Sequence, residues 1–243
     1  MAALKYLANL GYGTRREVRA LLAQRRVTDA NGRVVGPDDR VAHDDLRVDG
    51  APLDPPPGSV LLLHKPVGYV CSTADAHNPV IYALLPDRFR RRSPVIAPVG
   101  RLDLDTSGLL LLTDDGSLNH RLTSPRSHVA KVYEAELHEP LRGDETQVFG
   151  SGTLLLAGDP DPLAPASLDI LDARRVRVTI VEGRYHQVRR MFAAVGNHVV
   201  TLRRVQLGPL PLGDLPTGSW RVLTAEEREQ LVRPIESSPP RAP

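Results

Sequence analysis

Two carboxylates stand two positions apart in a polar segment that leads into an apolar run. Asp103 and Asp105 precede the four consecutive leucines Leu109–Leu112. Loops carried by rigid strands are favoured positions for reactive side chains. Such a pair could catalyse glycoside hydrolysis, hold a metal ion or cap a turn. The residues alone leave these interpretations open, although Arg101 beside the carboxylates and the lack of a nearby His or Cys argue against a metal site.

The elements that must position these carboxylates are short. Leu109–Leu112 and Val60–Leu63 are apolar runs of strand length, and the apolar residues Met191 and Phe192 indicate the buried side of a helix that begins near His186. Turns rich in glycine and proline separate many short strand-like pieces, and no regular strand–helix–strand alternation is visible. This pattern predicts an α+β fold whose larger domain is built on a mixed, mostly antiparallel sheet.

The composition is that of a globular protein that can bury a core. Of the 243 residues, 41% are hydrophobic and 25% are charged, which are ordinary values for that class. The single cysteine, Cys71, excludes an intrachain disulfide and fits a reducing compartment. No apolar run approaches the roughly 20 residues that cross a bilayer, and the N-terminus lacks the apolar core of a signal peptide. We therefore expect a cytoplasmic protein with no membrane partner.

Arginine is segregated along the chain. The segment 5–33 carries seven basic residues against two acidic ones, and the segment 184–204 carries five arginines and no acidic residue. Clustered basic charge is the electrostatic pattern of a protein that contacts phosphate groups. A solvated charged surface is the alternative interpretation of each cluster.

The beginning of the chain has the pattern of a small separate module. Thr14 and Glu17 have the spacing of a capping box and predict a helix that starts near Thr14, after a shorter helix over Leu4–Leu10. Short strand-like pieces follow, and the proline-rich segment 55–58 has the composition of a stiff linker. We expect a module over 1–54, the linker over 55–58, a larger domain over 59–232 and a disordered tail over 233–243. The longer helix carries three neighbouring basic residues, namely Arg15, Arg16 and Arg19.

The two small helices and the strands after them resemble the S4 RNA-binding domain. The matching text is GYGTRREVRALLAQRRVTDANGRVV. The chain departs from the family pattern at Ala3-Leu4-Lys5, where Arg-Leu-Asp is usual, and at Arg25, where glycine is usual. The resemblance implies that residues 1–54 form an S4-like module that binds RNA, and that the arginines of its second helix contact the substrate.

Three ordered motifs in the rest of the chain resemble those of the RsuA-like family of pseudouridine synthases. They are GRLDLDTSGLLLLTDDG at 100–116, KVYEAEL at 131–137 and EGRYHQVRRMFAAVGNHVVTLRRVQLGPLPLGDLPTGSWRVLT at 182–224. Two further segments, HKPVGYVCST and TSPRSHVAKVYEAEL, fit the synthases for 16S rRNA more closely than those for large-subunit rRNA. The resemblance implies a pseudouridine synthase catalytic domain over 59–232, with a substrate cleft across its sheet and Asp103 at the floor of that cleft.

The resemblance also implies roles for single residues. Asp103 matches the essential aspartate of the family, Tyr133 the tyrosine that stacks on the target base, and Arg189 the basic residue that pairs with the aspartate. Arg101 resembles the side chain that helps to hold the flipped nucleotide, and Leu202 corresponds to an apolar pocket residue. The remaining arginines of the third motif are expected to bind the RNA substrate, chiefly through phosphates; these are Arg184, Arg190, Arg203 and Arg204.

The implied reaction isomerises one uridine. The N1–C1′ bond breaks, the base turns, and C5 joins C1′, without net redox change, hydrolysis or transfer to another molecule. Neither a cofactor nor a metal is therefore expected. The target base must leave its stack, and stacking on Tyr133 would recover about 1–3 kcal/mol of that cost. The residues leave the order of bond changes open, because Asp103 could attack C1′, attack C6 or deprotonate C2′.

The expected partner is ribosomal RNA, either 16S rRNA or a small-subunit assembly intermediate. The protein is expected to act as a monomer on the uridine at position 516. One alternative is a pseudouridine synthase for 23S rRNA. Another is a non-catalytic S4-type rRNA-binding or ribosome-assembly protein, although the joint presence of Asp103, Tyr133 and Arg189 argues against it. Glycoside hydrolysis is a further alternative and predicts the release of free base or sugar.

Overall fold

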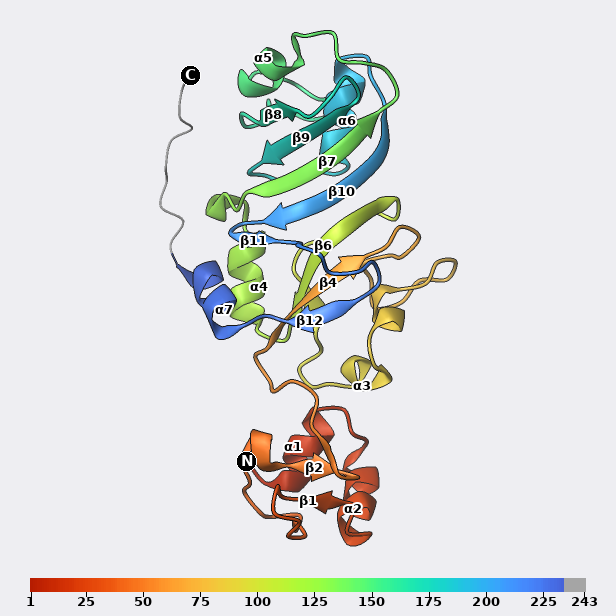
Figure 1. Cartoon of the computed structure of the whole chain (residues 1–243), viewed down its shortest axis with the longest axis vertical. Coiled ribbons are helices and arrows are strands. Elements are labelled where there is room, and N and C mark those ends of the chain that lie inside the picture. The colour runs from red at the N-terminus through yellow and green to blue at the C-terminus, as the bar shows by residue number, and fades with distance from the viewer. Residues whose placement is uncertain (234–243) are drawn as a thin grey trace.

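The computed structural model describes residues 1–233, which form a small N-terminal unit and a larger unit built on one sheet (Figure 1). Of the tail expected to be disordered at 233–243, residues 234–243 lie outside the described residues. No helix in the described part of the chain is both long enough and apolar enough to cross a bilayer.

The N-terminal unit consists of two helices packed on a small sheet. The predicted capping box is present, because Thr14 Oγ1 accepts from the Glu17 N–H and the Glu17 carboxylate accepts from the Thr14 N–H. Buried side chains that include Leu7, Val18 and Leu46 join the helices to the strands. The elements are α1 (Ala3–Asn9), α2 (Arg15–Ala23), the 3₁₀ turn η1 (His43–Asp45), and strands β1 (Val27–Thr28), β2 (Arg47–Val48) and β3 (Ala51–Pro52).

The larger unit is built on a nine-stranded sheet. Its main path runs β12-β4-β6-β10-β7-β9-β8, with β11 beside β10 and β5 beside β6. Strands β6 and β10 are parallel, and the other described neighbours are antiparallel. The structure therefore confirms the predicted α+β fold with a mixed, mostly antiparallel sheet. The strands are β4 (Val60–Lys65), β5 (Ala97–Pro98), β6 (Thr106–Thr113), β7 (Lys131–Leu137), β8 (Ser167–Ile170), β9 (Arg175–Ile180), β10 (Val199–Leu207), β11 (Leu210–Pro211) and β12 (Trp220–Val222).

The unbroken leucine run of β6 reflects burial on both faces of the sheet. Leu109 and Leu111 belong to one buried cluster, and Leu110 and Leu112 belong to another. Because successive side chains of a strand point to opposite faces, a strand covered on both sides needs apolar residues at every position. Helices α4 (Gly116–Thr123) and α7 (Ala225–Val232) contribute to the first cluster. The other is supplied by η2 (Ile81–Leu84), α3 (Asp87–Arg90), α5 (Glu145–Gly150) and α6 (Gln187–Ala194), while η3 (Pro125–Ser127) follows α4.

Polar contacts hold the N-terminal unit against the larger one. Arg88 donates two hydrogen bonds to Asp54, at 2.6 and 2.9 Å, and Arg92 donates to the carbonyl of Pro55 at 2.7 Å. The N–H of Ser93 donates to the carbonyl of Asn9 at 2.9 Å. Part of the basic segment 88–92 is the helix α3, and the Arg92 side chain is buried between the units.

Candidate active site

A cavity of about 390 Å³ opens where β6, β7 and β10 meet the segment between β9 and α6. Asp103 lines it from the turn between β5 and β6. Lys65 anchors this turn. Its buried ammonium donates to the backbone carbonyls of Asp103 at 2.9 Å, Thr106 at 2.8 Å and Pro66 at 3.1 Å. Burial lowers the pKa of Lys65, while Asp103 and Asp105 oppose that shift. Lys65 therefore fixes the backbone that carries Asp103.

The two aspartates of this turn have different partners. Asp103 Oδ1 lies 3.5 Å from His186 Nε2, whereas Asp105 Oδ2 lies 2.9 Å from the guanidinium of Arg189. Arg189 also donates to the carbonyls of Asp105 and of Val199, at 3.1 and 2.9 Å. The implied pairing of Arg189 with Asp103 is therefore absent from the structure. The geometry of the turn explains why this pairing is absent. The Thr106 N–H donates to the Asp103 carbonyl at 3.1 Å, and the Asp103 and Asp105 side chains line different cavities.

The structure places other expected residues around the cavity with Asp103. Tyr133 of β7 and Leu202 of β10 are both buried and line it, and Arg101 lines it from the same turn as Asp103. In the antiparallel pairing of β7 and β10, Tyr133 is opposite Arg204 and Leu202 is opposite Ala135. Opposite residues point to the same face of a sheet. Two neighbouring strands thus form the wall against which a planar base could lie.

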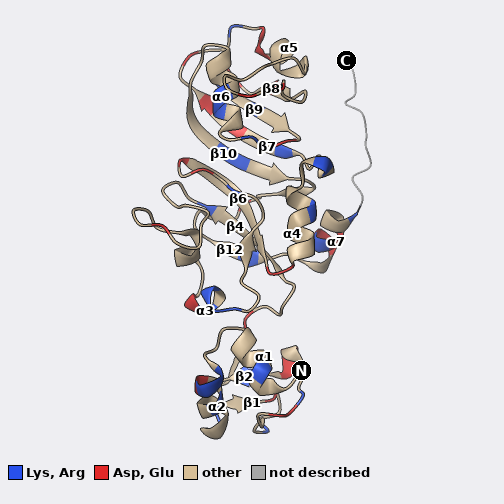
Figure 2. Ribbon diagram, turned by 180° about the vertical axis from the view of Figure 1, so that it is seen from behind, with Lys and Arg blue, Asp and Glu red and all other residues tan. Residues whose placement is uncertain are grey.

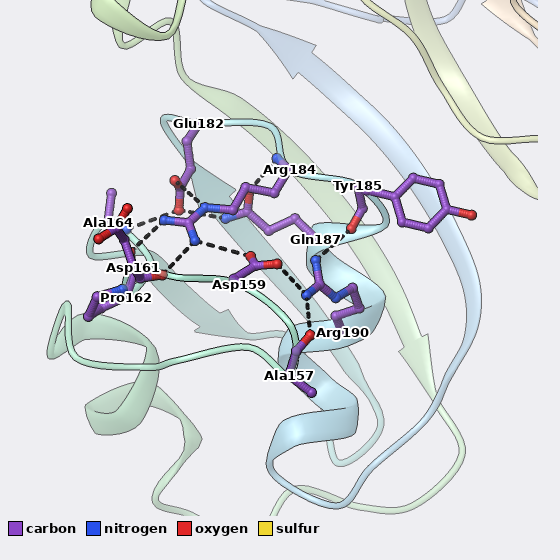
Figure 3. A network of polar contacts seen from close by, with 10 residues as sticks. All are labelled: Ala157, Asp159, Asp161, Pro162, Ala164, Glu182, Arg184, Tyr185, Gln187 and Arg190. Atoms are coloured by element: carbon purple, nitrogen blue, oxygen red, sulfur yellow. Dashed lines mark hydrogen bonds and ion pairs between the residues drawn. The ribbon is translucent and has the colours of Figure 1, made fainter.

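Two arginines expected to contact RNA are committed to contacts within the protein. Figure 3 shows Asp159 between Arg184 and Arg190, with ion-pair distances of 3.1 and 2.6 Å. Arg184 also pairs with Glu182 at 3.1 Å and donates to the carbonyl of Asp161 at 2.6 Å. Arg190 and then Arg184 hold the pKa of Asp159 below its usual range. The network ties the segment before β8 to the segment that carries His186, so phosphate contact is not the first role of these arginines.

The arginines on the second helix and on β10 differ in their surroundings. Arg203 lies on the opposite face of β10 from Arg204 and pairs with Glu134 at 2.8 Å, outside the cavity. Arg204 lines the cavity and is only 2% exposed, so its expected contact with backbone phosphates does not fit its depth. The exposed basic residues of α2 are grouped on the N-terminal unit (Figure 2), and they are Arg15, Arg16 and Arg19.

Some residues of the site escaped the sequence analysis. Lys65, Lys131 and Thr106 all contribute to the site, by anchoring its turn or by lining its cavity. In the sequence, Lys65 stands at the end of an apolar strand and Lys131 is the first residue of the second motif. Neither signal distinguishes a buried lysine from an exposed one, because a strand end can point its side chain either way. The sequence placed His186 at the start of a helix, but it did not predict that His186 lies close to Asp103.

The family follows from the fold, the site and comparison with known proteins. A model of the RNA pseudouridylate synthase family matches residues 59–194, and the chain belongs to this family. It is similar to "Ribosomal small subunit pseudouridine synthase A" of Yersinia pestis, with 42% identity over 226 residues, 92% of this chain and 94% of the relative. The protein of the same name from Escherichia coli (strain K12) is 45% identical over 190 residues, 77% of this chain and 80% of the relative.

A solved structure leads to the same conclusion. It is described as "Crystal structure of pseudouridylate synthase" and aligns with a TM-score of 0.68 and 37% identity, over 96% of this chain and 100% of that one. The resemblance to RsuA-like enzymes is thus confirmed, and the chain is a pseudouridine synthase.

Proposed function

We propose that this enzyme converts a uridine of 16S ribosomal RNA to pseudouridine, with Asp103 as its catalytic carboxylate. The names of the relatives from Yersinia pestis and Escherichia coli support the small-subunit substrate. The observation that carries the residue assignment is the position of Asp103 at a cavity walled by Tyr133 and Leu202. The finer target is the uridine at position 516, presented by 16S rRNA or by an assembling small subunit to a monomeric enzyme.

The geometry supports a separate role for each of these residues in binding the base or in the reaction. The flipped uracil stacks on Tyr133 and lies against Leu202, which offsets part of the cost of unstacking. Asp103 acts on the ribose or on the ring, and its carbonyl is held by Lys65 while its carboxylate is held near His186. A fixed carboxylate needs no reorganisation at the moment of reaction. Arg101, at the rim of the same turn, holds the displaced nucleotide.

The N-terminal unit supplies RNA affinity in this proposal. Residues 1–54 form an S4-like module, 55–58 link it to the catalytic domain over 59–232, and its exposed α2 carries the arginines that meet phosphates (Figure 2). Such contacts give salt-dependent affinity and orientation without choosing a base. Replacing the three arginines Arg15, Arg16 and Arg19 by glutamine should weaken RNA binding and reduce the salt dependence, while the rate of the bound complex is kept.

Pseudouridine mapping on unmodified 16S rRNA tests the proposal. Wild-type enzyme is compared with Asp103→Ala and with the matched variant Asp105→Ala, which removes the other carboxylate of the same turn. The expected result is one new pseudouridine with wild type, the same site with Asp105→Ala, and none with Asp103→Ala. RNA is offered bare and bound to small-subunit proteins, so that the form of the substrate is also determined.

Four outcomes would contradict the proposal in different ways. Modification confined to 23S rRNA would move the substrate to the large subunit. Activity that persists in Asp103→Ala but is lost in Asp105→Ala would move the catalytic role to the second carboxylate. Release of free uracil would indicate glycoside hydrolysis, and binding without modification of either rRNA would indicate a non-catalytic RNA-binding protein.

A further inference from the structure

We propose that Arg204 and Lys131 form a cationic floor of the cavity, which binds the carbonyl oxygens of the target uracil and stabilises the negative charge that they acquire during the reaction. The inference rests on the proposed function and adds to it the groups that carry the charge of the base. Both residues line the same cavity as Asp103 and Tyr133.

Arg204 is a buried cation whose hydrogen-bonding capacity is not filled. Its Nε donates to the carbonyl of Leu109 at 2.8 Å, but its buried Nη2 has no partner among the described residues. The buried hydroxyl of Thr106, which lines the same cavity, also has none there. Buried polar groups are nearly always hydrogen-bonded, so each exception requires an explanation. A ligand with acceptor groups at the floor of the cavity would supply one.

Lys131 brings a second positive charge to the same floor. Within residues 1–233 its Nζ donates one hydrogen bond, to the carbonyl of Val129 at 3.0 Å, and an ammonium has three donors. Burial, followed by the charge of Arg204, lowers the pKa of Lys131 to about 8, while Glu182 acts in the opposite direction. Two neighbouring cations, of which Arg204 is buried and Lys131 half-buried, are unfavourable for folding. Residues that lower stability at a cavity are expected to be kept because they bind a ligand there.

The position of Arg204 favours the base over a phosphate as the ligand. Arg204 is directly opposite Tyr133 in the pairing of β10 with β7, so both side chains point to one face of the sheet. A base stacked on Tyr133 therefore presents its edge to this floor. Phosphates carry a full charge and stay at the hydrated rim. Uracil offers two carbonyl acceptors, whereas the amino group of cytosine is a donor and would be repelled by the two cations.

The chemistry of the reaction places negative charge on these carbonyl oxygens by every route left open. When the N1–C1′ bond breaks, its electron pair goes to the base and is shared by N1, O2 and O4. If Asp103 first adds to C6, the displaced electron pair reaches O4 instead. In each route C5 then joins C1′ while Asp103 leaves C1′ or C6, or returns to C2′ the proton that it took; C5 loses its proton and N1 of the product takes one up, so that atoms and charge balance. Preorganised donors are most effective where charge develops in a water-excluded site.

The test compares single-turnover rates and RNA affinities of variants that keep side-chain size. Arg204→Met and Lys131→Met are measured beside Arg177→Met, which removes an arginine from the neighbouring strand β9, where it pairs with Glu134 outside the cavity. We expect the rate to fall by about 100-fold in each floor variant, as for loss of one preorganised donor. The affinity for RNA should change less than threefold, and Arg177→Met should keep the wild-type rate. Thermal melting of each variant shows whether it is folded.

A pH series supplies a readout that a structural role would not produce. As the pH rises through about 8, Lys131 loses its proton, so the wild-type rate should decline. Lys131→Arg, which stays charged, should show no such decline. Folded floor variants with wild-type rates, or equal losses in rate and affinity, would overturn the inference and leave the proposed function intact. A wild-type enzyme that modifies no rRNA would overturn both.

Discussion

Asp103 and Asp105 are separated by one residue, yet their carboxylates belong to different sites. Asp103 lines the cavity and lies 3.5 Å from His186, while Asp105 pairs with Arg189 at 2.9 Å and lines a second cavity on the other side of the turn. The turn thus separates the carboxylate that lines the cavity from the carboxylate that holds the turn to α6. This relationship makes the roles of the two aspartates separable by mutation.

A double-mutant cycle between Arg189 and the two aspartates should show this separation. Arg189→Met combined with Asp105→Asn should give a coupling of about 0.5–1 kcal/mol in the free energy of unfolding, because Asp105 is more than half exposed. The cycle with Asp103→Asn should give a coupling close to zero. Urea titrations of the four proteins in each cycle measure both values. Coupling to Asp103 instead would show that Arg189 pairs as the family motif implied.

His186 should position Asp103. Its Nε2 faces the carboxylate at 3.5 Å, and its ring stacks on Tyr185 with centroids 3.9 Å apart. We expect His186→Phe to lower the single-turnover rate by about 10-fold, since a misplaced reactive group costs rate without being removed. His186→Gln, which can still donate a hydrogen bond, should recover most of this loss. Equal losses in both variants would argue against positioning through a hydrogen bond.

Removal of Lys65 should weaken the fold and the site together. Lys65→Met leaves the carbonyls of Asp103 and Thr106 in the turn, and that of Pro66 beside Lys65, without their shared donor. Each unsatisfied buried group costs about 1–3 kcal/mol, so a loss of at least that size is expected in the free energy of unfolding. Chemical denaturation measures it, and single-turnover kinetics below the melting temperature should show a slower reaction. A variant as stable as wild type would contradict the anchoring role.

Asp159 should make the network of Figure 3 dependent on pH. Because Arg190 and Arg184 lower the pKa of Asp159 in the folded protein, its contribution to stability is complete above the unfolded pKa near 4 and is lost as the pH falls through the lower folded value. Asp159→Asn should flatten this part of the stability profile between pH 5 and 3, in melting temperatures measured beside wild type. Asp159→Asn should also slow catalysis, because the segment that carries His186 loses its ion pairs with Asp159.

Lys131 should oppose folding at neutral pH. Its folded pKa of about 8 lies below the usual value of 10.5, so the unfolded state binds the proton more tightly. Stability should therefore rise as the pH increases from 8 towards 10.5, with the penalty complete below 8. Lys131→Met should melt at a higher temperature than wild type at pH 7, and this advantage should shrink by pH 10. A lower melting temperature at pH 7 would contradict the assignment.

Periodicity and local pattern carried the prediction of the fold. The capping box at Thr14, the buried strand at Leu109–Leu112 and the mixed, mostly antiparallel sheet were all read correctly from spacing and residue type. These features depend on contacts between residues that are close in the sequence, or on a regular alternation of residue types along a strand. They are the part of a structure that local physical chemistry determines.

Partners distant in the sequence could not be predicted in the same way. The motif placed Arg189 with Asp103, but the turn at Asp103 sends the two carboxylates apart. The sequence assigned Arg184 and Arg190 to RNA binding, but both pair with Asp159, which comes from a loop without a motif. Charge counts along a chain do not say which arginines are already compensated in the fold.

The position of β10 in the sheet has a consequence for synthesis of the protein. Gly108 of β6 lies so close to the backbone of Arg204 that a β-carbon there would collide with it, and β10 is inserted between β6 and β7. The strand that completes the wall of the cavity thus leaves the ribosome only after both of its neighbours in the sheet. Until then, β6 and β7 each expose an unpaired edge, which is where nascent chains aggregate. An enzyme that acts on ribosomal RNA therefore cannot complete this cavity on the ribosome until β10 has been synthesised and has paired with both strands.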